Sequence, residues 1–169
     1  EHNYCWTVDP IDGTSNFLKG KKEFAVMISL SFLNKIIQSW IYKPITNEFM
    51  YAKISEGTFL NNKRIYVKNT KILSDCVGSI SSKYWKNDFE YKVNILKSNF
   101  KKINSYGSIG CEYFDMVLGK RDFTLLSKLL PWDHLPGVLI VREAGGHDSH
   151  FDRMRYKFNK KCENLIVSN

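Results

Sequence analysis

Two short segments, far apart in the sequence, carry the side chains best suited to chemistry. The first reads Asp9-Pro10-Ile11-Asp12-Gly13-Thr14-Ser15, and the second reads Pro131-Trp132-Asp133. Carboxylate oxygens are the hard ligands that Mg²⁺ prefers, and free backbone N–H groups at the start of a helix favour phosphate. If the three acids meet within a few ångströms, these segments predict magnesium-assisted phosphate chemistry.

The first segment has a geometry suited to a metal ion beside a phosphate group. Pro10 biases Asp9 toward an extended conformation, so Asp9 is expected at the carboxyl end of a strand. The carbonyl of Ile11 can then turn inward beside the two carboxylates. The amides of residues 13–15 are expected at a helix N-terminus, where the hydroxyl of Thr14 could orient a metal-bound water.

Each acid also has a structural alternative. Asp-Pro and Asp-Gly are ordinary turn dipeptides, and Asp12 could cap a short helix. Asp133 could likewise be the N-cap of a core helix, a role compatible with metal binding. Gly137 inside that helix costs about 1 kcal/mol relative to alanine, which indicates close packing by another element.

Taken together, the two segments resemble the inositol monophosphatase family of Mg²⁺-dependent, lithium-sensitive phosphatases. The matching residues are Trp6-x-x-Asp9-Pro10-Ile11-Asp12-Gly13-Thr14-x-Asn16-Phe17, then Trp132-Asp133-x-x-x-Gly137 and Glu143-Ala144-Gly145-Gly146. The resemblance implies a layered αβαβα sandwich of the sugar-phosphatase type, in the α/β (α+β) class, missing its N-terminal helices. It also implies a homodimer that acts on a small phosphorylated metabolite.

The same resemblance implies roles for the metal ligands, in a site that holds two or more Mg²⁺ ions. Asp9 would bridge two ions, and the Ile11 carbonyl would bind the first of them. Asp12 and Asp133 would hold the second ion.

The resemblance also implies which residues meet the substrate. Gly13 and Thr14 would contact the phosphate. The amide of Ser15 would contact it as well, because residues 13–15 are expected at the N-terminus of a helix. Gly107 and Ser108 match the family segment that touches the substrate alcohol.

Two departures from the family pattern bear on activity. Family members carry an upstream Gly-Glu-Glu segment that supplies a further metal ligand, and Glu1 is too close to Asp9 to replace it. The chain is therefore expected to be either part of a longer protein or a relative with impaired catalysis. Inositol-selective members have an acid seven residues before the distal aspartate, where this chain has Leu126, which argues against strict inositol selectivity.

The pattern of apolar residues predicts one domain over residues 1–169, incomplete at its N-terminus. Residues 1–72 are expected to form mainly antiparallel sheet, and residues 73–169 an α/β part. Strands are expected at 4–8, 23–32, 35–42, 48–53, 77–81, 103–106, 121–126 and 165–167, and helices at 88–100, 108–118 and 132–144.

Composition excludes several other classes of protein. The longest apolar run, residues 24–33, is too short and too polar to span a bilayer, so no membrane contact is expected. The chain does not open with a charged and then apolar signal segment, so a cytoplasmic protein is expected. The four cysteines lack CxxC spacing, which favours free thiols. No cysteine or third histidine lies near His147 and His150 in the sequence, which argues against a zinc site.

The formal net charge of +8 leaves a rival interpretation open. Basic residues are interleaved with aromatic ones in Lys83-Tyr84-Trp85-Lys86, and Lys101-Lys102 follows, a pattern that can bind nucleic acid. However, Phe89, Val93, Leu96 and Phe100 fall at helical spacing, so a core helix with a basic outer face is the preferred interpretation, and no nucleic acid is expected. The alternative function is a non-catalytic or truncated relative that acts as a basic nucleic-acid- or protein-binding module.

Overall fold

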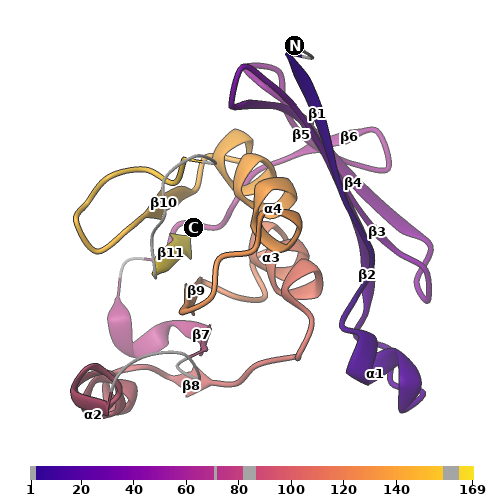
Figure 1. The fold of residues 1–169 in the computed structure, drawn as a ribbon. Helices are drawn as coiled ribbons and strands as arrows, with labels where there is room; N and C mark the ends of the chain where they lie inside the picture. Colours follow the sequence, from indigo (N-terminus) through magenta and orange to yellow (C-terminus); the bar gives the residue numbers. More distant parts are fainter. Residues whose placement is uncertain (1–2, 71, 82–86, 158–163) are drawn as a thin grey trace.

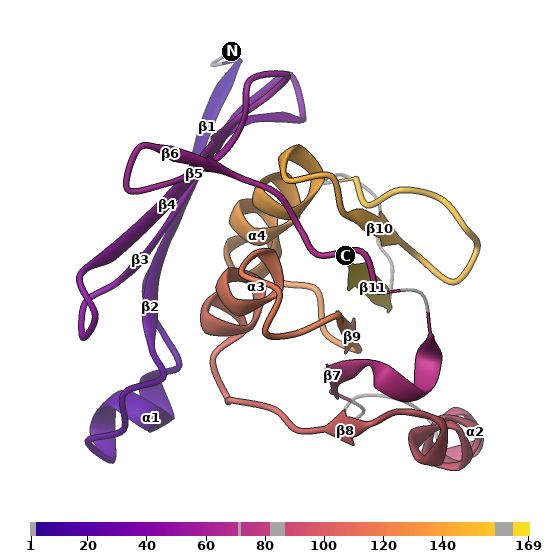
Figure 2. The ribbon, with the colours of Figure 1, turned by 180° about the vertical axis from the view of Figure 1, so that it is seen from behind.

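The structure is a computed structural model that describes residues 3–70, 72–81, 87–157 and 164–169. It is built in layers (Figures 1 and 2). A six-stranded sheet forms one side, helices α3 and α4 lie behind it, a five-stranded sheet follows, and α2 lies beyond the second sheet. This is the α/β sandwich that the sequence predicts. Among the described residues, no helix is long and apolar enough to cross a membrane.

The first sheet is an antiparallel meander in which every strand pairs with the next one in the chain. Strand β2 alternates between buried and half-buried residues along its whole length, as expected for a sheet with one face on the core. The β2–β3 turn places Leu33 and Asn34 at φ of 48° and 62°, which suits a two-residue hairpin. The strands are β1 Tyr4–Asp12, β2 Ala25–Phe32, β3 Lys35–Lys43, β4 Glu48–Lys53, β5 Gly57–Leu60 and β6 Lys63–Ile65.

The second sheet is mixed and has the strand order β10-β11-β9-β7-β8. Strand β7 runs parallel to β8 and β9, whereas β11 runs antiparallel to β9 and β10. Its strands are β7 Val77–Ile80, β8 Lys102–Ile103, β9 Phe123–Leu126, β10 His147–Ser149 and β11 Leu165–Ser168. The short strands β6 and β10 were not predicted, and β8 ends three residues earlier than expected.

Two helices fill the space between the sheets. Helix α3 is Ile109–Val117, and almost all of its residues are buried. Helix α4 is Pro131–Glu143, and it is buried over residues 134–141. They pack tightly, because a Cβ atom on Gly137 would lie 2.0 Å from the ring of Tyr113. The close approach expected at Gly137 is therefore present.

The remaining helices are short or peripheral. Helix α1 is Thr14–Leu18, α2 is Asn87–Leu96, and the 3₁₀ turns are η1 Leu73–Asp75 and η2 Lys97–Asn99. In the expected α2 stripe, Val93 is buried but Leu96 is 51% exposed. The basic and aromatic residues at 82–86 lie outside the described residues.

Candidate metal centre

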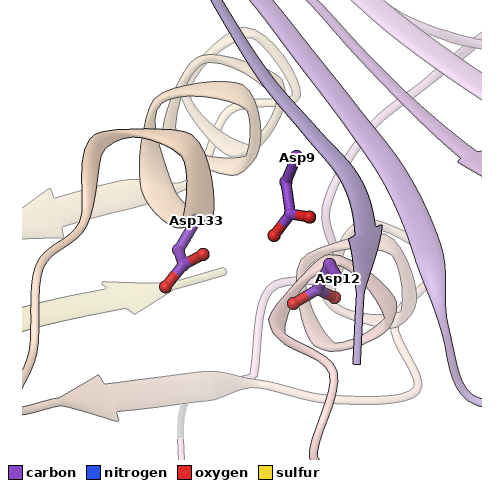
Figure 3. A group of neighbouring side chains, drawn as sticks. All are labelled: Asp9, Asp12 and Asp133. Carbon is purple, nitrogen blue, oxygen red and sulfur yellow. The ribbon is translucent and has the colours of Figure 1, made fainter. Parts of the chain in front are cut away.

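The three acids singled out in the sequence converge in space. One carboxylate oxygen from each of Asp9, Asp12 and Asp133 lies within 4.8 Å of the other two. Figure 3 shows Asp9 and Asp12 at the end of β1 and Asp133 at the start of α4, with all three carboxylates pointing into the same space. Among the described residues, this is the one group of three or more acids, histidines or cysteines arranged in this way.

The end of β1 brings its two acids to the same side. The strand continues through Asp12, and its pairing with β2 becomes irregular between Asp9 and Asp12. The amide of Ile11 donates a hydrogen bond of 3.0 Å to Oδ1 of Asp9. The expected turn at residues 9–12 is therefore a distorted strand end, which places both carboxylates beside α4.

The Gly-Thr-Ser run follows directly and begins α1. Gly13, at φ 84°, is the N-cap residue, so the alternative that Asp12 caps this helix is wrong. The hydroxyl of Thr14 donates a 2.9 Å hydrogen bond to the carbonyl of Ile11. Thr14 and Ser15 are exposed at the first turn, where backbone amides have no intrahelical acceptor.

Asp12 is held by the N-terminus of α3. Its Oδ2 accepts hydrogen bonds from the Ser108 hydroxyl at 2.5 Å and the Gly110 amide at 2.8 Å, and its Oδ1 accepts one from the Ile109 amide at 3.2 Å. These bonds and the helix dipole favour the ionised carboxylate. Ser108 was predicted to touch the substrate alcohol, and the structure shows that its hydroxyl contacts Asp12.

Asp133 enters the site from the first turn of α4. The N-cap residue of that helix is Leu130, and the amide of Asp133 donates a 3.1 Å hydrogen bond to its carbonyl. Asp133 is therefore inside the helix, and the N-cap alternative is wrong. Its carboxylate remains available to face Asp9 and Asp12.

Burial and nearby negative charge disfavour the ionised forms of Asp12 and Asp133. The pKa of Asp133 is raised to about 7, chiefly by burial and then by the charges of Asp12 and Asp9. The pKa of Asp12 is raised to about 6, again chiefly by burial, despite the hydrogen bonds from Ser108 and Gly110. A divalent cation would offset this repulsion, because its positive charge lies between the negatively charged carboxylates.

Asn16 fixes the loop before α3, a role that was not predicted. Its side chain is buried, and Nδ2 donates hydrogen bonds to the carbonyls of Glu23 at 2.7 Å and Tyr106 at 2.8 Å. The next residue after Tyr106, Gly107, adopts φ 72°, a conformation that glycine tolerates best. Asn16 thus joins α1 to the turn that presents Ser108 to Asp12.

His134 fixes the segment before α4 and was likewise missed. It is 2% exposed, with Nε2 lying 2.8 Å from the Lys128 carbonyl and Nδ1 3.1 Å from the Tyr113 hydroxyl. Burial lowers its pKa to about 4, so the ring is neutral near pH 7. A neutral ring with Nε2–H donating to Lys128 and Nδ1 accepting from Tyr113 satisfies both contacts.

A cavity of about 300 Å³ adjoins the carboxylates. Its lining includes Asp12, Asp133, the Gly107–Ile109 turn, Leu126, Lys128 and His134. The volume is at the lower end of the range for small-molecule sites, roughly 300–1,000 Å³. The site can therefore hold a small ligand against a group of metal-ligating oxygens.

Comparison with known proteins places this geometry in a family. The model of the inositol monophosphatase family matches residues 1–169. A fructose-1,6-bisphosphatase/inositol-1-monophosphatase of Thermotoga maritima is 32% identical over 165 residues, which are 97% of this chain and 62% of that protein. A Nus factor SuhB of Vibrio cholerae is 35% identical over 144 residues, which are 83% of this chain and 54% of that protein.

Solved structures agree. The Thermotoga maritima IMPase superimposes on all of this chain and 65% of its own, with a TM-score of 0.87 at 30% identity. The extragenic suppressor protein SuhB of Bartonella henselae covers 99% of this chain and 66% of its own, with a TM-score of 0.89 at 31% identity. This chain therefore spans about two thirds or less of the length of these relatives.

Proposed function

The chain belongs to the inositol monophosphatase family, and from that premise we propose that the protein is a Mg²⁺-dependent phosphatase of small phosphate monoesters. The observation that carries the proposal is the convergence of Asp9, Asp12 and Asp133 beside a cavity of metabolite size. Hydrolysis would use a water molecule activated by the bound metal. A cytoplasmic homodimer is part of the same proposal.

The residues present fit a hard divalent cation. The three carboxylates, of which Asp12 and Asp133 have raised pKa values, and the nearby carbonyl of Ile11 form the oxygen-rich ligand set that Mg²⁺ takes. Asp9 would be shared between two ions, with Asp12 and Asp133 on the second. When bound, such ions supply an acidified water and charge stabilisation for the phosphoryl oxygens and the leaving group.

The chain's own groups would bind and orient the ester. The amides at Gly13, Thr14 and Ser15 offer fixed donors to phosphate oxygens beside Asp12. Thr14, held to Ile11 by its hydrogen bond, would orient the attacking water. Gly107 lies in the cavity wall, where its turn would face the alcohol of the substrate.

Replacement of the bridging acid tests the proposal. We expect Asp9→Asn in the whole protein to reduce Mg²⁺-dependent phosphate release by at least about 100-fold, because a neutral amide is a poor metal ligand. A calorimetric Mg²⁺ titration should show weakened binding in the same variant. The matched control is Glu56→Gln, which removes an exposed carboxylate that pairs with Lys53. Full activity in Asp9→Asn would contradict the metal-bridging role.

The names of some relatives favour a second candidate function. Several relatives carry the name Nus factor SuhB, and for this chain that supports a non-catalytic nucleic-acid- or protein-binding module. The described residues include exposed Lys101 and Lys102, which would form part of a basic surface. Salt-sensitive binding to single-stranded nucleic acid, without release of phosphate from any ester, would favour this candidate over the phosphatase.

A further inference from the structure

A second cavity, with a volume of about 580 Å³, lies at the C-terminal end of α4, beside the β2–β3 turn and residues 155–157. We propose that this cavity binds a small organic anion that has two or more negative charges and an apolar body. Asp133 and Glu143 are about 15 Å apart along the axis of α4, at a rise of about 1.5 Å per residue, so this cavity is separate from the candidate metal centre. The inference goes beyond the proposed function, because it involves neither the three acids nor a metal ion.

Part of the cavity lining is apolar and buried. Ile36 of β3 is 8% exposed, Leu139 of α4 is 2% exposed, and Tyr156 is 5% exposed. A ring or a hydrocarbon chain that packs against these side chains would leave water, which favours binding of the apolar part of a ligand. The lining therefore suits a ligand that is not a simple inorganic ion.

Another part of the lining is exposed and positively charged. Lys35, Arg155 and Lys157 line the cavity, and all three are exposed. Within the described ranges of the chain, no acid forms an ion pair with any of them. A ligand with several negative charges would therefore meet three cations whose charges are not already neutralised by the fold.

The two other charged residues of the lining are committed to the fold. Arg142 is paired with Asp148. The Glu143 carboxylate accepts hydrogen bonds of 3.0 Å from the amides of residues 55 and 57. The charge that remains for a ligand is that of the three exposed cations, and it is positive.

The segment that carries two of these cations is held in place at Tyr156. The Tyr156 amide donates a 2.8 Å hydrogen bond to Oδ2 of Asp148, and the Tyr156 carbonyl accepts one of 2.8 Å from Nη2 of Arg142. The backbone between Arg155 and Lys157 is thus bound to the ion pair at the end of α4. Because this backbone is fixed before a ligand binds, less conformational entropy is lost on binding.

Calorimetric titration of the whole protein with benzene-1,3,5-tricarboxylate tests this inference. EDTA in the buffer keeps metal ions out, and the three acids of the candidate metal centre then repel the probe. We expect a Kd below about 1 mM, and binding at least about 10-fold weaker for benzoate, which has the same ring and a single charge. Propane-1,2,3-tricarboxylate has the same charge without the ring and should bind about 3-fold more weakly or less tightly still.

Single substitutions locate the bound anion. Lys35→Gln, Arg155→Gln and Lys157→Gln should each weaken binding of benzene-1,3,5-tricarboxylate by about 3- to 10-fold, because each removes one cation from the lining. Lys63→Gln is the matched control and should leave the affinity unchanged. It removes the same charge from the exposed β5–β6 turn, at the other end of β5 from the cavity.

Four results would overturn the inference. They are no binding to the wild type, equal binding of benzoate or of propane-1,2,3-tricarboxylate, unchanged affinity in the three lining variants, and an equal loss in Lys63→Gln. The last result would assign binding to the net charge of the chain rather than to the cavity. Because the titration uses no metal ion and no ester, a failure of the phosphatase proposal would leave this test unaffected.

Discussion

The two ends of α4 hold their charges in opposite ways. At its C-terminal end, Arg142 forms a bidentate ion pair with Asp148, with distances of 2.5 Å for Nε–Oδ1 and 2.7 Å for Nη2–Oδ2. The amide of Tyr156 donates a further hydrogen bond to the same carboxylate at 2.8 Å. At the N-terminal end, Asp133 instead faces two carboxylates, Asp9 and Asp12.

This difference separates a structural site from a candidate functional site. The Asp148 side chain is fully buried, and its charge is neutralised by a cation within the same fold. The three acids at the other end raise one another's free energy and remain suited to an external cation. Residues that destabilise a fold locally in this way are common at functional sites.

The largest effect expected from this contrast is on stability. Asp148→Asn should lower the free energy of unfolding by about 3 kcal/mol, because half-buried Arg142 loses its countercharge and the buried side of the ion pair is removed. Asp133→Asn should raise it by about 1 kcal/mol in the absence of metal, because one of three like charges is removed. Urea unfolding at pH 7.5 with EDTA measures both values.

Glu56→Gln serves as the control for these two variants, since exposed ion pairs contribute at most about 1 kcal/mol. The contrast would fail if Asp133→Asn destabilised the metal-free protein as much as Asp148→Asn does. That result would mean that Asp133 is a structural acid like Asp148.

A smaller effect is expected on the pH dependence of stability. The pKa values of Asp12 and Asp133 are raised from 3.8 to about 6 and about 7, so the folded chain holds protons that the unfolded chain has already released. Without metal, the free energy of unfolding should therefore fall as the pH rises from about 4 to about 7, by about 3 kcal/mol from Asp12. Urea titrations at pH 4.5 and pH 8 give the slope.

Mg²⁺ should remove this loss, because a bound cation favours the ionised carboxylates. The Asp133→Asn variant should show a shallower slope than the wild type in EDTA. A slope unaffected by either Mg²⁺ or this substitution would show that the three acids are not coupled in the folded protein.

Local patterns in the sequence predicted much of the fold. Alternation of apolar residues placed β2 and β3, and Ser108 and Gly119 marked the two ends of α3, as observed. The three-residue strands Lys63–Ile65 and His147–Ser149 were missed, since they are too short to show a periodic pattern. Their existence depends on pairing with neighbouring strands in the folded chain.

The acids of the site were predictable, but the residues that hold them were not. Two motifs identified Asp9, Asp12 and Asp133, and the position of Asp133 was misjudged because Pro131 starts the helix earlier. Asn16 contacts Tyr106, which is far from it in the chain, and His134 contacts Tyr113 in the buried core. No local pattern encodes such contacts, although Asn16 belongs to the first motif.

The smallest predicted effect concerns Ser108. This residue has a structural role in capping α3 and also contacts an acid of the candidate metal centre. Its hydroxyl accepts a hydrogen bond from the Cys111 amide as the N-cap of α3 and donates one to Asp12 in the candidate metal centre. Ser108→Ala should cost about 1 kcal/mol of stability, as for a lost N-cap, and should weaken Mg²⁺ binding by roughly 10-fold, as for a lost contact to a metal ligand. Ser108→Thr keeps the hydroxyl and should restore both properties. Urea unfolding and Mg²⁺ calorimetry on the three proteins separate the two roles, and a loss of stability without any change in Mg²⁺ affinity would restrict Ser108 to capping.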